Sequence, residues 1–270
     1  MSAFELSDLV GCLALESVGP DRFRVRNLPM DYYRIFGGQL LAQAIVAAAA
    51  AEGGKTVTSL AVTFPREGDW SAETEIVVPS VHSGRTFATR TVEVLQADRP
   101  LMVGTILLHA PEPGEGHQVP VPDGSSPDSA SATEFSMIPW ETRGKDGVDL
   151  SAPEQGAPEF DLWMRAPDAP DDPTVQQALL AHATDRTLIG TTLRAHAGLS
   201  QADSPERIHT AVVSHSLWFH APVQLRDWLC LHQHSPVSGG GRGFGLGHVV
   251  NSQGGIVASF AQESMIRLLS

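Results

Sequence analysis

Lysine and cysteine are both scarce in this chain, and basic residues are outnumbered by acidic ones. Its 270 residues include 2 Lys and 2 Cys, and 18 Lys and Arg stand against 31 Asp and Glu, for a formal net charge of −13 at pH 7. Proteins that bind nucleic acid by neutralising its phosphates have an excess of Lys and Arg. We therefore expect no nucleic-acid partner.

The two cysteines and the short apolar runs exclude further classes of protein. Cys12 and Cys230 are too few to ligate a metal by themselves, and such low usage is typical of a reducing compartment. The most apolar stretch, residues 40–51, is too short to span a bilayer, and the N-terminus lacks a basic segment followed by an apolar one. These absences predict a cytoplasmic protein with no membrane partner.

Several catalytic sequence motifs are also absent. The chain has no Gly-x-Ser-x-Gly, no Walker motif, no His-Glu-x-x-His and no Cys-x-x-Cys. The glycine-rich stretch 238–247 lacks the dinucleotide-binding spacing, and we interpret it as a hairpin turn that leads into a strand. The 11 histidines are scattered along the chain. We expect neither a metal nor an organic cofactor.

Residues 111–173 differ in composition from the rest of the chain. They hold 14 of the 31 acidic residues, 3 of the 18 basic residues and 11 of the 19 prolines, so their net charge is −11 and that of the remainder is −2. Such a segment buries too little apolar surface to offset the entropy lost on ordering. We predict a largely irregular acidic linker between residues 1–110 and residues 174–270.

The two segments that flank this linker repeat each other. The letters LAQA at 41–44 recur as LAHA at 180–183, and RTF at 85–87 recurs as RGF at 242–244. Matches that keep a common order indicate a duplicated unit.

Each unit begins with a helical pattern and continues with runs typical of β-strands. The expected helices are 37–52 and 174–185, and the expected strands are 59–65, 74–80, 86–96, 101–110, 209–220, 228–234, 243–252 and 256–268. Small residues in a helix allow a sheet to lie close to it. The pattern predicts an α+β fold with a long antiparallel sheet wrapped around one central helix in each unit.

Six stretches of the chain, taken together, resemble a known family. They are RIFGGQL at 34–40, SGRTFATRTVEVLQ at 83–96, APEPGEGHQ at 110–118, LLAHATD ending at 185, HSLWFHAP at 215–222 and VASFAQESMIR ending at 267. In combination they are similar to the acyl-CoA thioesterase II family, the TesB-like double hot-dog thioesterases. The resemblance implies two tandem hot-dog units, 1–110 and 174–270, and acyl-CoA as the substrate.

The resemblance also implies a mechanism, in which an activated water hydrolyses the thioester to a free fatty acid and CoA without a covalent intermediate. The family's catalytic Asp and Gln fall on Asp185 and Gln262. Its Thr or Ser falls on Val212, which has no hydroxyl. Thr210 and Ser214 are the candidates for a third polar group, since alternation puts them on the same strand face as Val212, each about 6.6 Å away along the strand.

The chemistry of Asp185 and Gln262 is consistent with these roles. Asp185 follows the mostly apolar run 178–184, so we expect a partly buried carboxyl whose raised pKa suits a general base; the alternative is a helix-end cap or a partner of Arg186. Gln262 can orient a water, or it is an ordinary polar residue of an edge strand. The position that corresponds to Asp185 in the first unit is Val46, which predicts one active site per chain.

The remaining substrate contacts are predicted from residue type. Gly37, Gly38 and Gln39 open the first unit's helix, where backbone N–H groups can stabilise the thioester oxygen as it gains charge; tight packing is the alternative for the glycine pair. Candidates for an apolar acyl tunnel are Phe36, Leu40, Leu217, Trp218 and Phe219, and candidates for CoA phosphates are Arg85, Arg90, Arg242 and Arg267. Plain core packing and surface ion pairs are the alternatives for each of these.

Two other functions compete with thioester hydrolysis. A hot-dog hydratase or dehydratase would need a His and an Asp placed to move a proton at carbon, and the D-x-N-P-x-H stretch of that branch is absent. A non-catalytic or weakly active acyl-CoA-binding protein is the alternative that Val212 motivates. In either case exposed sheet edges favour a homo-oligomer.

Overall fold

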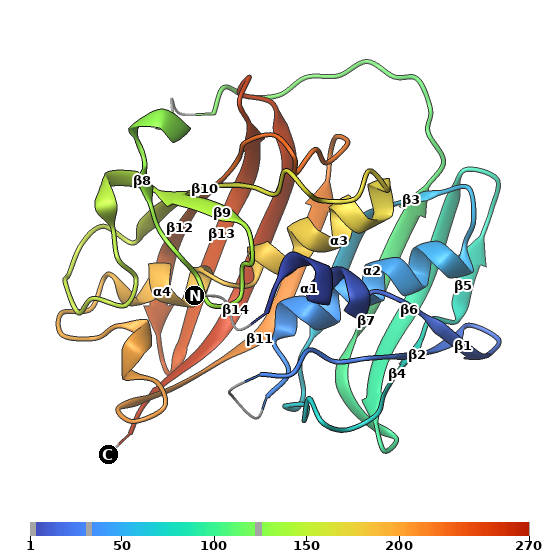
Figure 1. The fold of residues 1–270 in the computed structure, drawn as a ribbon, viewed down its shortest axis with the longest axis horizontal. Coiled ribbons are helices and arrows are strands. Elements are labelled where there is room, and N and C mark those ends of the chain that lie inside the picture. Colours follow the sequence, from blue (N-terminus) through green and yellow to red (C-terminus); the bar gives the residue numbers. More distant parts are fainter. Residues whose placement is uncertain (1–3, 31–33, 122–125, 270) are drawn as a thin grey trace.

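One large antiparallel sheet dominates the fold, with the helices on one of its faces (Figure 1). The computed structural model describes residues 4–30, 34–121 and 126–269. Within them the sheet has 14 strands in the order β1-β2-β4-β6-β7-β3-β11-β14-β13-β12-β10-β9-β8, and β5 pairs with β6 outside this row. The strands are Glu16–Gly19 (β1), Arg22–Val25 (β2), Thr56–Thr63 (β3), Thr74–Val77 (β4), Ser80–Ser83 (β5), Phe87–Gln96 (β6), Arg99–His109 (β7), Ser131–Ala132 (β8), Glu141–Gly144 (β9), Glu159–Arg165 (β10), Ile208–Phe219 (β11), Leu229–Gly239 (β12), Arg242–Asn251 (β13) and Ile256–Leu268 (β14).

Two helices pack against each other on the sheet, α2 (Gly37–Ala51) and α3 (Pro173–Thr184). Helix α3 begins where the side chain of Asp172 accepts hydrogen bonds from two backbone N–H groups, with a proline at the first helical position. The other helices are short, α1 (Leu6–Cys12) and α4 (Leu188–Leu193), with single 3-10 turns at Pro127–Ser129, Lys145–Gly147 and Gln201–Asp203. The two expected helices are therefore confirmed.

The halves of the chain meet at the centre of the sheet. Strand β3, which follows α2, pairs with β11, which follows α3 and α4, from Ser214 opposite Thr63 to Trp218 opposite Ser59. On both sides of this pair the strands alternate between buried and more exposed residues, and the buried faces enclose the two helices. The apolar core is therefore continuous from one half to the other.

The predicted irregular linker differs from the structure in its second half. Residues 111–121 have no regular structure and run along one end of the sheet in Figure 1, and residues 122–125 lie outside the described residues. Strand β10, however, pairs with β12 over most of its length and buries Phe160, Leu162 and Met164. Residues 161 and 163 between them are buried as well, and a composition averaged over the whole acidic segment hides so short a mostly apolar run.

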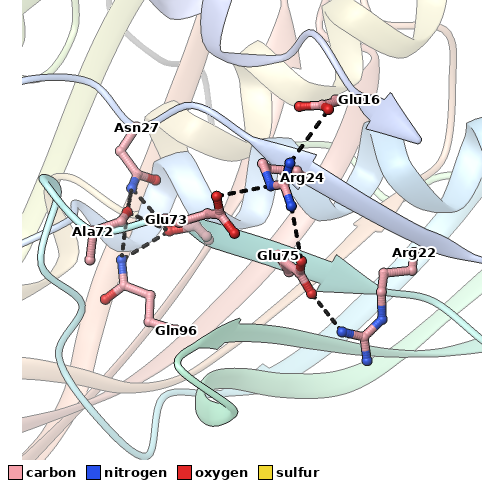
Figure 2. Close-up of polar contacts among 9 residues, drawn as sticks. Glu16, Arg22, Arg24, Asn27, Ala72, Glu73, Glu75 and Gln96 are labelled. Carbon is pink, nitrogen blue, oxygen red and sulfur yellow. Dashed lines mark hydrogen bonds and ion pairs between the residues drawn. The ribbon is translucent and has the colours of Figure 1, made fainter. Parts of the chain in front are cut away.

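Charge pairs cover the β1 edge of the sheet (Figure 2). Arg24 on β2 contacts Glu16 on β1 at 3.4 Å, Glu73 at 3.1 Å and Glu75 on β4 at 3.8 Å, and Arg22 contacts Glu75 at 2.5 Å. Charged side chains on an edge disfavour pairing with a strand from another molecule. This edge is therefore protected by its composition.

A buried charge network holds the C-terminal end of α2. The Arg90 guanidinium on β6 donates to the Ala51 carbonyl at 2.6 Å and pairs with Glu52 at 3.0 Å and Asp21 at 2.9 Å. Hydrogen bonds from Lys55 and Ser83 help lower the pKa of Glu52 to about 2. A cation at the C-terminal end of a helix also complements its dipole.

Candidate active site

A pocket of about 570 Å³ lies where the N-terminus of α2, the end of α3 and strand β11 meet. Its wall is mostly apolar and includes Phe36, Leu40, Phe64, Met137, Ile189 and Val212. The charged residues that line it are Asp185, Arg34, Arg66, Glu67 and Arg186. An apolar cavity with a few convergent polar groups is the usual form of a small-molecule site.

Asp185 is the buried acid of this pocket. It caps the C-terminus of α3 and is 4% exposed. Burial raises the pKa of its carboxyl to about 7, against the opposing effects of a hydrogen bond from the Gly38 backbone and the charge of Arg186. Its Oδ1 atom has no hydrogen-bond partner among the described residues. A carboxylate oxygen in that state is available to accept a proton from a bound water or substrate.

The glycine pair at the start of α2 allows this carboxyl to reach the helix. A Cβ atom on Gly37 would lie 2.8 Å from Asp185 Oδ2, and one on Gly38 would lie 2.4 Å from the His182 carbonyl oxygen on α3. Gly37 therefore leaves room for the acid, whereas Gly38 leaves room for the backbone of the neighbouring helix. Gly37 lines the pocket and the Gly38 N–H is occupied by Asp185.

Gln262 lies on β14, buried behind the pocket, in a row of polar side chains. His215 Nε2 is 3.1 Å from Thr184 Oγ1, His215 Nδ1 is 3.2 Å from Gln262 Oε1, and Gln262 Nε2 donates to Ser264 Oγ at 3.0 Å. All four residues are buried. A fully buried row of this kind holds each of its members in one orientation.

The row also assigns the proton of His215. The Gln262 oxygen that faces Nδ1 can only accept, so Nδ1 carries the proton and Nε2 is an acceptor. Thr184 Oγ1 donates to the Ala181 carbonyl at 2.9 Å and shares this single proton with Nε2, at 3.1 Å, in a three-centre hydrogen bond. Asp185 Oδ1 is 3.9 Å from Nδ1. Burial lowers the pKa of His215 to about 4, so the ring is neutral near pH 7 and this contact is no ion pair.

The position without a hydroxyl, Val212, does line the pocket. Strand β11 is bulged against β14 between Val212 and Ser214, so alternation restarts one residue later and His215 faces the helices. Thr210 lines the pocket, with its hydroxyl 3.3 Å from Ser204 Oγ. Ser214, in contrast, is not part of the pocket wall. The expectation that Ser214 shares the face of Val212 is wrong, because a bulge shifts the two-residue period.

Gln39 does not reach the pocket. Its side chain is fully buried, accepting from the Leu28 N–H at 3.1 Å and donating to Asn27 Oδ1 at 3.1 Å. It anchors the segment before α2 to that helix. The position of Gln39 in the first turn of α2 did not predict this role, because its hydrogen-bond partners, Asn27 and Leu28, precede the helix in the chain.

The candidate substrate contacts divide into two groups. Phe36 and Leu40 line the pocket, whereas Leu217 and Phe219 lie in the core and Trp218 is 43% exposed. Among the proposed phosphate contacts, Arg90 is committed to the buried network around Glu52, and Arg242 pairs with Glu263 at 2.8 Å. The arginines at the pocket are instead Arg34, Arg66 and Arg186.

His215, Thr184 and Ser264 are not among the site residues predicted from the sequence. His215 stands inside a stretch used for the family resemblance, and Ser264 follows Gln262 by two residues, so alternation along the strand is the signal that could have identified Ser264. Among residues 4–30, 34–121 and 126–269 no group of three or more His, Cys, Asp or Glu could hold a metal ion. No helix in that part of the chain is long and apolar enough to cross a membrane.

Two family models match the chain, and together they include every residue of this site. The acyl-CoA thioesterase N-terminal domain matches residues 26–109, and the acyl-CoA thioesterase C-terminal domain matches residues 113–266. The second match is longer than half of the chain.

Individual relatives are similar over nearly the full length. Acyl-CoA thioesterase 2 of Haemophilus influenzae is 28% identical over 97% of this chain and 98% of its own. The solved tesB protein of Mycobacterium avium subs paratuberculosis is 29% identical, with a TM-score of 0.84 over 97% of this chain and 99% of that one. A hot dog fold protein of unknown function from Alicyclobacillus acidocaldarius is 19% identical, with a TM-score of 0.79 over 97% and 98%. This last likeness concerns the fold alone.

Proposed function

Because the chain belongs to the TesB-like acyl-CoA thioesterase II family and is a thioester hydrolase, we propose that Asp185 activates the water that attacks an acyl-CoA thioester. The observation that supports this role most strongly is a buried carboxyl, with pKa raised to about 7, whose Oδ1 lacks a partner among the described residues in an apolar pocket. A general base is most effective when its pKa lies near the working pH.

The proposed reaction balances without a cofactor. Asp185 takes one proton from the water as the water oxygen bonds to the thioester carbonyl carbon. The tetrahedral intermediate then collapses, the C–S bond breaks, and Asp185 returns the proton to the leaving sulfur. The products are a carboxylic acid and the free thiol of CoA.

The start of α2 is the proposed site for the thioester oxygen. Gly37 lines the pocket beside Asp185, and the N-terminal end of a helix favours negative charge. Since the Gly38 N–H already binds Asp185, the Gly37 N–H is the donor assigned to the oxygen. Gln262, whose side chain is oriented by its hydrogen bond with His215, acts with Asp185 in placing the water.

The pocket suggests how the rest of the substrate binds. Phe36, Leu40 and Ile189 would contact the acyl chain, which gains free energy by leaving water. Arg66 and Arg186 at the same pocket would contact the anionic CoA end.

Several finer expectations about the molecule are part of the same proposal. We take the hot-dog fold to be a double one, with units 1–110 and 174–270 that each contribute one central helix. The central pairing of β3 with β11 and the packing of α2 on α3 support this division. A homo-oligomer, a cytoplasmic location and the absence of a nucleic-acid partner stay predictions.

The test is the release of free CoA thiol from a panel of acyl-CoAs of increasing chain length. Replacing Asp185 with Asn should lower kcat by about 10²- to 10⁴-fold, since the base is lost and the side-chain volume is kept. Asp98→Asn is the matched control, because Asp98 is exposed and is not part of the pocket wall, and it should leave kcat unchanged. Equal activity of the Asp185→Asn variant and the wild type would exclude this role for Asp185. No turnover of any acyl-CoA by the wild type would instead favour the acyl-CoA-binding alternative.

The pH dependence gives an independent measurement on the same protein. Only the ionised carboxylate can accept a proton, so kcat/KM should rise as the pH increases through about 7 and then level off. A profile that is flat across this range would show that a group other than Asp185 limits the rate.

A further inference from the structure

The hydroxyl missing from Val212 is present on the neighbouring strand. In the β11–β14 ladder Val212 stands directly opposite Ser264. Side chains of directly opposed residues lie on the same face of a sheet, with Cβ atoms about 4.5–5.5 Å apart. The Cβ atom of Ser264 therefore lies beside that of Val212, which lines the pocket, while Ser264 itself is buried behind the pocket wall as Gln262 is.

Ser264 is held in a defined orientation. It is 3% exposed, and its Oγ accepts from Gln262 Nε2 at 3.0 Å. Gln262 is fixed at its other end by His215, and His215 by Thr184. A serine oxygen accepts two hydrogen bonds and donates one. Among the described residues the bond from Gln262 is the one recorded for this oxygen, which leaves a lone pair and the hydroxyl proton available.

We propose that Ser264 supplies the third polar group of the active site and that its Oγ holds the attacking water together with Asp185 and Gln262. This rests on the proposed function of Asp185. As Asp185 removes one proton of the water, the other O–H of the water donates a hydrogen bond to the free lone pair of Ser264 Oγ. Ser264 forms no bond to the substrate, and its own proton stays in place throughout.

In this proposal β11 contributes the apolar residue of the pair and β14 the polar one. Val212 lines the pocket and packs against the cluster of Ile189, Leu193 and Ile208, while the hydroxyl lies on β14 beside Gln262. Because the hydroxyl and the amide sit two residues apart on one strand, a single strand carries both of the neutral groups that place the water.

The first measurement is kcat and KM for thioester hydrolysis by Ser264→Ala. We expect kcat to fall by about 10- to 100-fold with KM changed less than threefold, since the hydroxyl acts on the water and not on the acyl chain. Ser216→Ala is the matched control, because Ser216 lies between the buried residues His215 and Leu217 on β11 and therefore faces away from the helices; it should keep the wild-type kcat. A wild-type kcat for Ser264→Ala would overturn the proposal.

Rescue separates a catalytic hydroxyl from a structural one. Ser264→Thr should keep kcat within about threefold of wild type, since it keeps the hydroxyl, whereas Ser264→Cys keeps the volume with a much weaker hydrogen-bonding group and should lose about as much activity as Ser264→Ala. In the Ser264→Ala background, Val212→Thr places a hydroxyl across the ladder and should restore at least tenfold in kcat. A folded double variant that stays as slow as Ser264→Ala would overturn the proposal, as would a fully active Ser264→Cys.

Comparing Ser264→Ala with Asp185→Asn distinguishes failure of the Ser264 assignment from failure of the proposed function. If Asp185→Asn abolishes hydrolysis while Ser264→Ala does not slow it, the base is confirmed and Ser264 is excluded as a catalytic group. If Asp185→Asn is fully active, the proposed function fails whatever the serine variants show, and the assignment of Ser264 falls with it.

Discussion

At the scale of single residues, burial of the proposed base, Asp185, lowers the stability of the fold. Asp185 is buried and its pKa rises from 3.8 to about 7 on folding. Because the folded state binds this proton more tightly than the unfolded chain does, the free energy of unfolding falls as the pH rises between about 3.8 and about 7. The same desolvation that suits the carboxyl to act as a base therefore opposes the fold at neutral pH.

Asp185→Asn should consequently stabilise the protein in a pH-dependent way. At a pH above about 7 the variant should gain on the order of 4 kcal/mol in free energy of unfolding, because the amide carries no charge to desolvate, and near pH 4 the gain should vanish. Urea denaturation of both proteins at several pH values measures the difference. A gain of the same size at both extremes would mean that burial of the charge is not its cause.

How much of the site could be predicted differs from residue to residue. The apolar run before Asp185 predicted a buried carboxyl, and the structure places one there. The row of polar residues behind the pocket could not be inferred in the same way. Gln262 is 47 positions from His215 in the chain, and His215 is 31 positions from Thr184. Hydrogen bonds between distant residues depend on strand register, which local patterns leave open.

At the scale of elements, the two adjacent glycines at the start of α2 have different roles, one next to the Asp185 carboxyl and one next to helix α3. Gly37 faces the Asp185 carboxyl and Gly38 faces the α3 backbone, so a side chain at either position meets a different obstacle. A carboxyl can turn aside at the expense of its orientation. A carbonyl in a packed helix has much less room to move, because its neighbours are close-packed.

The two alanine variants should therefore separate activity from stability. Gly37→Ala should lower kcat by about tenfold or more with a small change in stability, because its Cβ displaces Asp185 Oδ2. Gly38→Ala should cost about 1–3 kcal/mol or more in unfolding free energy, because its Cβ collides with the His182 carbonyl. Activity at saturating acyl-CoA and urea denaturation give the two values. An equal loss of stability in both variants would show that both glycines serve packing alone.

Strand β11 shows where local patterns reach their limit. Its extent was predicted closely, because a β-branched run of this length is typical of a strand. The bulge after Val212 was not, and it decides that Ser214 is excluded from the pocket while His215 faces inward. A bulge arises from how a strand pairs with its neighbour, here β14, so the sequence of β11 alone does not reveal it.

At the scale of the whole molecule, the charges fall into two classes of environment. Arg24 and its partners lie at the β1 edge, where their side chains are 24–65% exposed. Arg90 and Glu52 are each 6% exposed and join β6 to the end of α2. Water screens the first group and scarcely reaches the second.

Removing one charge from each class should distinguish them. Arg24→Met should change the unfolding free energy by less than about 1 kcal/mol, as is usual for exposed ion pairs. Arg90→Met should cost about 1–3 kcal/mol or more, because Glu52 keeps Lys55 and Ser83 but the Ala51 and Val78 carbonyls lose their guanidinium donor. Urea denaturation of both variants near neutral pH is the measurement. Equal effects would contradict the assignment of the Arg90 network as a structural support of α2.

From the sequence alone one could predict the two central helices, eight of the 14 strands among the described residues, and the family with its hydrolase chemistry, because propensity, alternation and short motifs are local properties of the chain. Which residues these elements bring together depends on the tertiary fold. It recruited β10 from the acidic segment, set Gly37 against Asp185, and paired Val212 with Ser264. Each of these contacts joins residues far apart in the chain, and packing and strand register select them collectively.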